Sequence, residues 1–330
     1  MAATGLTGST VVALALVGAL VALAVRPVFS GAERDRSSVT QATPISAAGI
    51  ADASSTTTSS STSSTSSTTS TTSTTSTTST TSTTAPPAPM LVWADEFDGA
   101  VDSGPDPARW RFDIGGHGWG NAQLEFYDDT HARLDGAGHL VITAEPTTPG
   151  GEPPCWYGPC RFVSSRLTTE GLVSHHHGRI EVRARLPRGD ATWPAVWMLG
   201  NNRAEAGWPA CGEIDILEHV GRSGDEVHGA LHGPGYSGGA AIVGSTEIDD
   251  VTAFHTYRVD WRPDSIVWSV DDRPFHRVDR DDVEIWPFDQ PFHLIVNLAI
   301  GGTLGGEPTD GDLRPHELVL DHVRVFDLGA

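Results

Sequence analysis

The chain has 330 residues and a formal net charge of −21, and each of its 21 basic residues is an arginine. A chain without lysine cannot form a lysine Schiff base or a P-loop, which needs a Gly-Lys-Ser/Thr sequence. The three arginines and three acids before residue 90 cancel, so the charge excess lies beyond that point, where it disfavours nucleic acid and anionic membranes and suits neutral partners.

Residues 11–25 form an apolar run that suits the core of a signal peptide and is too short for a comfortable membrane span. The sequence Val-Phe-Ser before Gly31 provides a cleavage site, whereas Arg26, Arg34 and Arg36 follow the run instead of preceding it. We therefore expect residues 1–30 to be a signal peptide or an uncleaved N-terminal membrane anchor. The protein is then extracellular or tethered to the cell surface.

The next segment has the composition of a linker. Residues 54–84 are all Ser or Thr, and Ala-Pro-Pro-Ala-Pro follows them. Such a composition cannot bury a core. We expect residues 31–89 to be a disordered linker, open to O-glycosylation, and residues 90–330 to fold as one domain.

The remaining part of the chain, about 240 residues, is long enough for one large domain with a substantial core. Polar and apolar residues alternate in short runs, as in a half-buried strand, and clusters of turn-forming residues separate these runs. We find no sustained amphipathic helix. The sequence therefore predicts an all-β domain, with strands at residues 179–186, 256–261, 292–300 and 318–326.

One strand-like segment, residues 212–219, carries three acids. In an unbroken strand Glu213 and Asp215 share a face and Glu218 points away, but one extra residue, a β-bulge near Ile216 and Leu217, would return Glu218 to that face. Three carboxylates on one surface repel each other and are tolerated mainly where chemistry needs acids with separated pKa values. A solvated strand face is the alternative.

For the cysteines and a histidine triplet we expect structural roles without catalysis or metal binding. Cys155 and Cys160 bracket a turn-like Trp-Tyr-Gly-Pro and could close a small disulfide, although their pairing stays open. Cys211 is expected to be a buried free thiol. The residues 175–177 are all histidine, but adjacent strand residues face opposite ways and cannot converge on one ion, so we expect a solvated strand edge.

Paired acids on a β-surface, nearby tryptophans and an exported domain together favour hydrolysis of a neutral polysaccharide. Two carboxyl groups suffice for glycoside cleavage. The segment Glu213-Ile-Asp-Ile-Leu-Glu218 resembles the bulged acidic signature of glycoside hydrolase family 16, specifically its laminarinase-like endo-β-1,3-glucanases. Blocks in the same order elsewhere share this resemblance: residues 119–125, 178–187, 193–200, 208–212, 286–292 and 297–302.

The resemblance implies an all-β fold, a concave β-jelly-roll sandwich of two antiparallel sheets with a sugar cleft along the inner one. It implies that Glu213 is the nucleophile of a retaining enzyme, that Glu218 is its acid/base, and that Asp215 hydrogen-bonds the nucleophile. The expected substrate is a neutral β-glucan of the laminarin type, and a monomer is expected.

The resemblance also implies cleft contacts. Trp193 and Trp197 would stack on sugar rings, with core packing as the alternative, and Asn121, Arg166 and His232 would supply polar contacts. Many relatives carry a tryptophan shortly after the Gly-Gly pair 301–302. This chain has Thr-Leu-Gly-Gly at 303–306, so weaker binding is expected there.

No cofactor is expected for the chemistry. A structural calcium on the convex sheet is implied as an option, with Glu96 and Asp321 as oxygen ligands near the meeting point of the terminal segments. Two alternatives to a β-1,3-glucanase stay open. One is another family 16 specificity, such as mixed-linkage glucan or galactan cleavage, which the bulge disfavours. The other is a non-catalytic glucan-binding protein, which the presence of Glu213 and Glu218 disfavours.

Overall fold

The structure is a computed structural model that describes residues 88–329. The predicted leader, residues 1–30, lies outside the described residues, as does nearly all of the predicted linker, residues 31–89. Both boundaries stay predictions. Within residues 88–329, no helix combines the length and the apolar character needed to cross a membrane.

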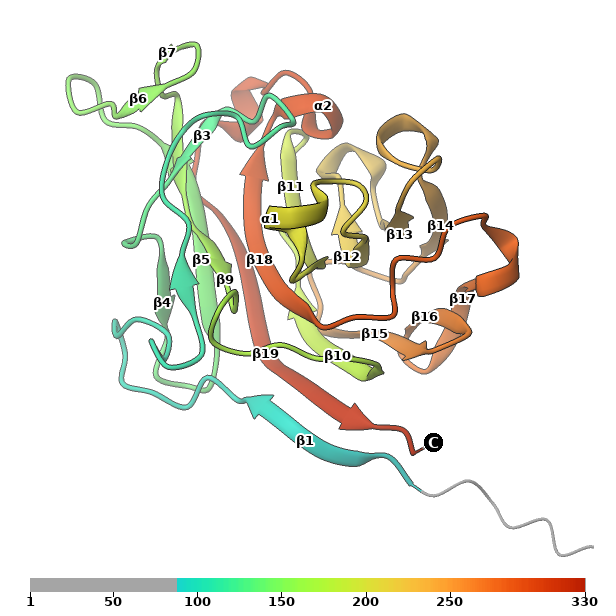
Figure 1. The fold of residues 1–330 in the computed structure, drawn as a ribbon. Helices are drawn as coiled ribbons and strands as arrows, with labels where there is room; N and C mark the ends of the chain where they lie inside the picture. Colours follow the sequence, from blue (N-terminus) through green and yellow to red (C-terminus); the bar gives the residue numbers. More distant parts are fainter. Residues whose placement is uncertain (1–87, 330) are drawn as a thin grey trace, which may run out of the picture. The chain divides into compact units, whose positions relative to one another are not determined.

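Strands dominate the domain and form two large sheets (Figure 1). The ten-stranded sheet has the order β17 (Arg273–Asp279), β16 (Ser265–Val270), β15 (His255–Arg262), β10 (Gly178–Arg185), β19 (His316–Asp327), β5 (Leu140–Pro146), β8 (Phe162–Ser164) and β3 (Glu125–Tyr127). Two further strands join it at its middle: β1 (Met90–Asp95) pairs with β19, and β4 (Ala132–Leu134) pairs with β5.

The seven-stranded sheet has the order β14 (Ile242–Glu247), β13 (Glu226–His232), β12 (Glu213–His219), β11 (Thr192–Gly200), β18 (Phe292–Ile300), β9 (Arg166–Thr168) and β2 (Arg111–Phe112). A separate hairpin joins β6 (Pro154–Cys155) to β7 (Gly158–Pro159). Among the described strands every pairing is antiparallel except that of β3 with β8.

Helical segments are short. They are α1 (Arg203–Ala206), α2 (Gly302–Gly305) and the 3-10 turns η1 (Gly221–Ser223), η2 (Gly238–Ala240), η3 (Arg280–Asp282) and η4 (Asp310–Asp312). The expectation that the domain has no sustained helix therefore holds for residues 88–329, and the predicted all-β class is confirmed.

The core lies between the two sheets and follows the alternation in the sequence. In β10 every second residue is buried, beginning at Gly178, and in β15 the apolar residues Tyr257, Val259 and Trp261 are buried in the same way. Every residue of β18 is buried. Leu294 and Val296 belong to the core cluster, whereas His293 and Ile295 on the other face line a cleft. This second face is where the site lies.

The structure agrees with the expectation for Cys211 and differs in part from the one for the histidine triplet. Cys155 and Cys160 form a disulfide, and Cys211 is free and buried, as expected. The histidine triplet does not form a group of potential metal ligands, but it is not a solvated edge throughout. His175 is 9% exposed and packs its ring 5.5 Å from that of Trp93. His175 also forms an isolated β-bridge with Phe292, a contact between distant segments that the sequence does not indicate.

Candidate active site

A large cleft runs along the face of the seven-stranded sheet that points away from the core. It encloses about 1110 Å³. Side chains from β9, β11, β12, β13, β14 and β18 line it, together with residues of the loops before β3 and after β18. The cleft contains Glu213 and Glu218, which β12 contributes from the middle of the sheet.

The predicted β-bulge is present in β12. Asp215 pairs with Ala230 and Glu218 pairs with His228, so two residues of β12, Ile216 and Leu217, lie opposite the single Gly229 of β13. The register with β11 shifts at the same place. The extra residue brings Glu218 to the face that Glu213 occupies, and both side chains reach the cleft.

Two of the three acids accept a hydrogen bond from a tryptophan, and the third is buried. Trp208 donates its indole N–H to Glu213 Oε2 at 2.7 Å, and Trp193 donates its indole N–H to Glu218 Oε1 at 3.0 Å. Asp215 is 2% exposed and lies beneath the other two.

His232 lies beside this cluster. Its Nε2 is 3.1 Å from Asp215 Oδ2 and 3.9 Å from Glu213 Oε1. These three residues are the one group in residues 88–329 whose ligand atoms could surround a cation.

Aromatic side chains form the walls of the cleft. Trp193 and Trp197 both line it, as predicted. Trp193 is only 6% exposed, and its indole is hydrogen-bonded to Glu218. Trp197 donates its indole N–H to Asn297 Oδ1 at 2.8 Å.

Arg166 lies between two of these aromatic rings. Its guanidinium carbon is 4.7 Å from the ring centroid of Trp119 and 4.8 Å from that of Trp197. Its Nε donates to Asp113 Oδ2 at 2.9 Å. The rings and the carboxylate together fix the arginine side chain and neutralise its charge.

Comparison with known proteins identifies the family. A family model for glycosyl hydrolases family 16 matches residues 121–312. The chain belongs to this family. The beta-glucanase of Rhodothermus marinus is 44% identical over 72% of this chain and 84% of its own length, and the glucan endo-1,3-beta-glucosidase of Cryptopygus antarcticus is 38% identical over 67% and 84%. The crystal structure of the laminarinase catalytic domain from Thermotoga maritima has a TM-score of 0.68 and 40% identity, and the match covers 72% of this chain and 98% of that one.

The family confirms three predictions made from the acidic signature. The chain is a glycoside hydrolase, its fold is the jelly-roll sandwich of family 16, and the enzymes of this family need no cofactor for their chemistry. The roles of individual residues stay predictions. The structure brings Glu213, Glu218, Trp193, Trp197, Asn121, Arg166 and His232 together in one cleft, with Asp215 beneath them.

Burial and mutual repulsion raise the pKa values of the three acids in the family 16 signature. Burial and the nearby Asp215 raise the pKa of Glu213 to about 8. Burial and repulsion by Glu218 raise the pKa of Asp215 well above its usual range, and burial raises the pKa of Glu218. The three acids therefore share protons at neutral pH instead of all being ionised.

Two tryptophans of the cleft, Trp119 and Trp208, were not predicted as site residues. Both lie within sequence blocks that resemble the family, so a signal for them existed, but nothing in the sequence shows that Trp208 reaches Glu213. Past Gly302 the cleft is lined by Thr303 and Leu304. Aromatic stacking is therefore lacking at the position where the sequence predicted weaker binding.

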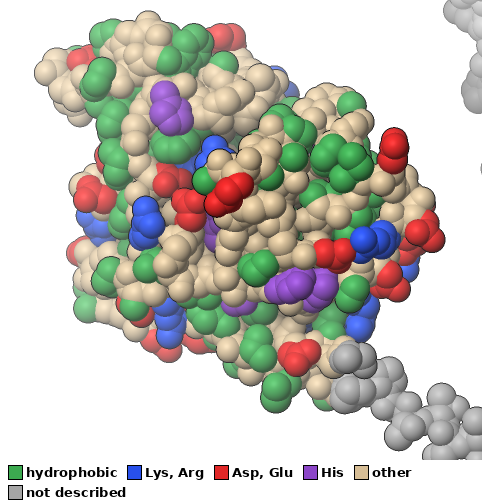
Figure 2. All heavy atoms as spheres, viewed as in Figure 1, with side chains coloured by type: hydrophobic (Ala, Val, Ile, Leu, Met, Phe, Trp, Pro, Cys, Tyr) green, Lys and Arg blue, Asp and Glu red, His purple; other side chains and the backbone are tan. Residues whose placement is uncertain are grey.

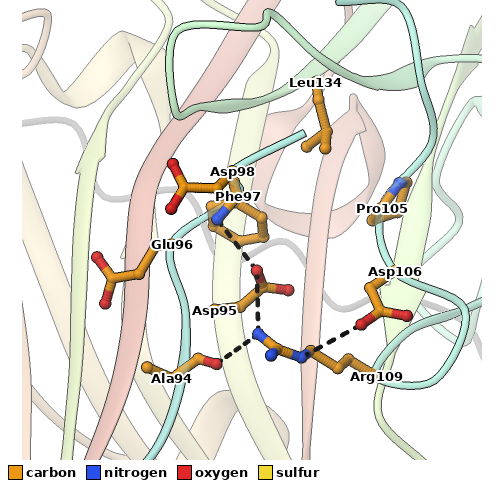
Figure 3. A pocket seen from close by; sticks show the side chains of 9 residues that line it. All are labelled: Ala94, Asp95, Glu96, Phe97, Asp98, Pro105, Asp106, Arg109 and Leu134. Atoms are coloured by element: carbon orange, nitrogen blue, oxygen red, sulfur yellow. Dashed lines mark hydrogen bonds and ion pairs between the residues drawn. The ribbon is translucent and has the colours of Figure 1, made fainter. Parts of the chain in front are cut away.

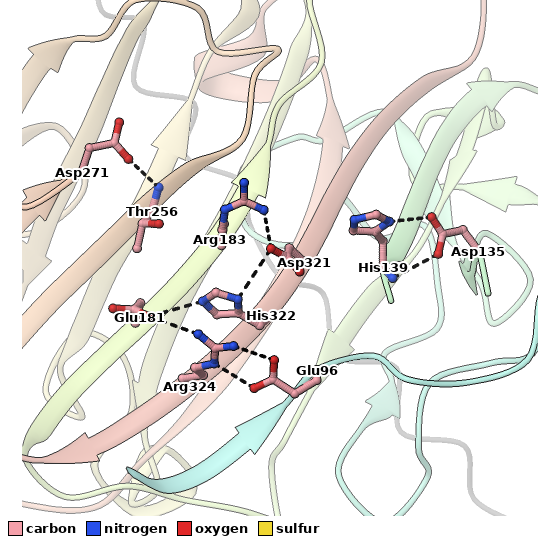
Figure 4. Close-up of polar contacts among 10 residues, drawn as sticks. All are labelled: Glu96, Asp135, His139, Glu181, Arg183, Thr256, Asp271, Asp321, His322 and Arg324. Atoms are coloured by element: carbon pink, nitrogen blue, oxygen red, sulfur yellow. Dashed lines mark hydrogen bonds and ion pairs between the residues drawn. The ribbon is translucent and has the colours of Figure 1, made fainter. Parts of the chain in front are cut away.

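The two predicted calcium ligands do not fit a calcium ion as the structure holds them (Figure 4). Both carboxylate oxygens of Glu96 accept hydrogen bonds from Arg324 at 2.8 Å. Asp321 pairs with Arg183 and lies 3.7 Å from His322 Nδ1. The terminal strands β1 and β19 do meet here, as expected, but each of the two carboxylates is already neutralised by a cation.

A second, smaller cavity of about 380 Å³ lies at the end of β1 (Figure 3). Asp95, which lines it, has its partners within the protein. Asp95 accepts hydrogen bonds from the backbone of Phe97 at 3.0 Å and the indole of Trp110 at 2.8 Å, and Arg109 lies 3.4 Å from it. None of the residues that line this cavity lines the cleft, and we assign it no catalytic role.

Proposed function

We propose that the domain is a retaining endo-β-1,3-glucanase that hydrolyses neutral glucans of the laminarin type. The observation that carries the proposal is the bulge in β12, which places Glu213 and Glu218 together in a cleft walled by tryptophan. The names of two relatives, a glucan endo-1,3-beta-glucosidase and a laminarinase, support the linkage.

In the proposed reaction Glu213 attacks the anomeric carbon while Glu218 gives its proton to the departing glycosidic oxygen. Glu218 then removes a proton from the water that breaks the covalent intermediate. The raised pKa of Glu218 suits the first, acidic role.

The raised pKa of Glu213 requires a separate explanation, because a nucleophile must be ionised. Below about pH 8 the free enzyme keeps a proton on Glu213, so we propose that this proton passes to the more deeply buried Asp215, whose pKa is raised well above its usual range, before Glu213 attacks. In that state a protonated Asp215 would donate a hydrogen bond to Glu213, and the indole N–H of Trp208 donates one to Glu213 Oε2 at 2.7 Å. Both bonds favour the carboxylate form of Glu213.

The walls of the cleft suit an uncharged sugar chain. Trp119, Trp193 and Trp197 offer aromatic surface to apolar sugar faces, whereas the positive charge of Arg166 is already matched by Asp113. On the face shown in Figure 2, acidic and arginine side chains are intermixed without a continuous basic patch. A sulfated galactan would need several converging unpaired cations, whereas the two other arginines that line the cleft, Arg203 and Arg222, come from the separate short segments α1 and η1.

Other family 16 specificities are the second candidate. One relative is named a beta-glucanase, a name that does not specify the linkage, so weaker action on mixed-linkage glucan is compatible with it. A non-catalytic glucan-binding role is not favoured, because both glutamates are present and each accepts a hydrogen bond within the cleft.

Reducing-sugar release from laminarin, lichenan, agarose and carrageenan tests the proposal. We expect the highest rate on laminarin, less on lichenan and none on carrageenan. Proton NMR of the first products should show the β-anomer. Preferential attack on agarose, or α-anomeric first products, would contradict it.

The structural calcium that the family resemblance implies is tested separately, because Glu96 and Asp321 are both paired with arginines in the structure. Binding through Glu96 and Asp321 would require both carboxylates to leave their arginine partners. Melting temperatures measured with added calcium and with a chelator decide the matter. A calcium-dependent rise that Asp321→Asn abolishes supports the site, and equal melting temperatures contradict it.

We also propose that the enzyme works outside the cell as a monomer, free or tethered through its N-terminal segment. The apolar run at residues 11–25 and the Ser/Thr-rich segment support export. Detection of the protein in the medium or on the surface of intact cells, with its molar mass measured by light scattering, tests both parts.

A further inference from the structure

The hairpin of β6 and β7 has no role in the chemistry above, yet it contacts a loop that supplies residues to the cleft. A disulfide between Cys155 and Cys160 closes the hairpin. In Figure 1 the hairpin projects at the end of the domain where β3 lies, and β6 contacts β3. Residues 115–124, which precede β3, form what we call the Trp119 loop.

Three hydrogen bonds join the hairpin to the Trp119 loop. Trp156 donates its backbone N–H to the carbonyl of Gly116 at 2.8 Å and its indole N–H to the carbonyl of Gln123 at 2.9 Å. Tyr157 donates its hydroxyl to the carbonyl of Leu124 at 2.6 Å. The hairpin therefore contacts the loop near both of its ends.

The contact is also close-packed. A Cβ atom at Gly116 would lie 2.4 Å from Cys155 Sγ, and one at Gly118 would lie 2.9 Å from the indole nitrogen of Trp156. Only glycine allows the loop backbone to approach the disulfide and the indole this closely. Gly118 has a φ of +79°, a conformation that glycine adopts without strain.

On its other side the Trp119 loop faces the cleft, where Trp119 and Asn121 are lining residues. Trp119 has a φ of 52° and Ala122 has a φ of 55°. Non-glycine residues rarely adopt such values, and they persist only where surrounding contacts hold them. The shape of the loop therefore depends on its support from outside.

The loop serves a part of the cleft away from the reacting atoms. Trp119 stacks on Arg166 of β9, and β9 is three strands from β12 in the sheet order. Strands lie about 4.8 Å apart, so the two positions are separated by roughly 14 Å. That distance corresponds to more than one sugar unit along a glucan chain.

We propose that the disulfide-closed hairpin is a clamp that positions Trp119 and Asn121 to bind the part of a glucan chain lying over β9. Trp156 and the disulfide are positioning elements and do not touch the reacting atoms. The inference rests on the proposed function, because it takes a glucan chain to be the occupant of the cleft.

The clamp predicts an effect on binding that depends on chain length. Loosening the Trp119 loop should raise KM for laminarin and for long β-1,3-oligosaccharides while leaving kcat nearly unchanged. Oligosaccharides too short to reach from β12 to β9 should be unaffected. A general loss of stability would instead lower the active fraction and reduce the apparent kcat for every substrate equally.

Three variants test the clamp: Trp156→Ala, Trp156→Phe, and the double change Cys155→Ser with Cys160→Ser. For Trp156→Ala we expect KM for laminarin to rise about tenfold, which corresponds to about 1.4 kcal/mol of binding free energy. Trp156→Phe keeps an aromatic ring without the donor and should give a smaller rise. Leu91→Ala, at an equally exposed apolar residue on β1, is the matched control and should match the wild type.

Affinity is measured separately by calorimetry with a long and a short β-1,3-oligosaccharide, in a Glu218→Gln background that cannot turn them over. If the double cysteine variant fails to fold, Trp156→Ala still tests the clamp with the disulfide intact. An inactive wild type on every glucan would overturn the proposed function. An active wild type, with KM and affinity unchanged in Trp156→Ala or weakened equally for both chain lengths, would overturn the clamp.

Discussion

Glu213 and Glu218 have different partners at the residue scale, and the proposed mechanism gives them separable tasks. Replacing either by glutamine should lower kcat by several orders of magnitude, because water cannot take over the lost role. With an activated aryl glycoside, Glu218→Gln should still form the covalent intermediate, since a good leaving group needs little protonation. Added azide should then accelerate turnover and give a β-azide.

Glu213→Gln should instead give an α-azide, if azide rescues it at all, because azide then replaces the missing nucleophile. Product anomers are read by NMR. Glu247→Gln, an exposed acid on β14 of the same sheet, serves as the control and should keep full activity. A β-azide from Glu213→Gln and an α-azide from Glu218→Gln would reverse the assignment.

The raised pKa of Glu213 also has a consequence for stability. Its folded-state pKa of about 8 lies above the ordinary value of 4.5, so the fold favours the protonated form. The resulting stabilisation is complete below the ordinary value and is lost as the pH rises through about 8. Glutamine cannot ionise and avoids this loss.

We therefore expect Glu213→Gln to have a higher melting temperature than the wild type at alkaline pH and a similar one in acid. A gain of about 2–4 °C is what ~1 kcal/mol produces in a domain of this size. Thermal unfolding on both sides of the pKa of Glu213 measures it. An equal difference at both pH values would show that the carboxyl is not held protonated.

Around the three acids, some features follow from local sequence and others depend on distant segments. The spacing of Glu213, Asp215 and Glu218 was sufficient to predict the bulge, because strand geometry is local. The indole of Trp208 could not be assigned to Glu213, since that contact depends on how the segment before β12 folds back. The stacking of Arg166 between Trp119 and Trp197 joins three distant segments and has no local signal.

At the scale of elements, the bulge depends on the strand beside it. Gly229 lies opposite Ile216 and Leu217, and a Cβ atom there would be 2.3 Å from Trp268 Cδ1. Trp268 is fully buried and donates its indole N–H to the carbonyl of Asp215 at 2.7 Å. The tryptophan thus supports the acidic strand from the core side.

Gly229→Ala should therefore displace Trp268 and disturb the acids together. We expect a loss of about 1–3 kcal/mol in unfolding free energy, the usual cost of overpacking a core, and a fall in kcat in the protein that remains folded. Gly151→Ala is the control, because its Cβ would meet only the carbonyl of Thr148 at 3.5 Å. An unchanged melting temperature and kcat would show that Trp268 can move without affecting β12.

The long strands could be predicted and the short ones could not. β10 and β15 show the alternation that a half-buried strand requires, and β18 and β19 are long, mainly buried strands with many apolar residues. Strands β3 and β8 have three residues each, too few for a period to be recognised, and their parallel pairing is non-local. The order of strands in each sheet likewise depends on contacts between distant segments.

At the scale of the whole molecule, the catalytic machinery lies within the described residues. Every residue that lines the cleft falls between Asp113 and Leu304, and the family match spans 121–312. The charge excess also lies beyond residue 90. Substrate binding and catalysis therefore require nothing that residues 1–89 supply in the proposed mechanism.

A chain that begins at Met90 should therefore fold and keep the kcat and KM of the full chain on soluble laminarin. β1 begins at this residue and pairs with β19 from Met90 onward, so no strand pairing is lost. Circular dichroism, melting temperature and initial rates of both chains make the comparison. A shortened chain that begins at Glu96 is the matched control, because it lacks β1 and should melt at a lower temperature. A folded Met90 chain with reduced kcat would show that the preceding residues do more than tether the enzyme.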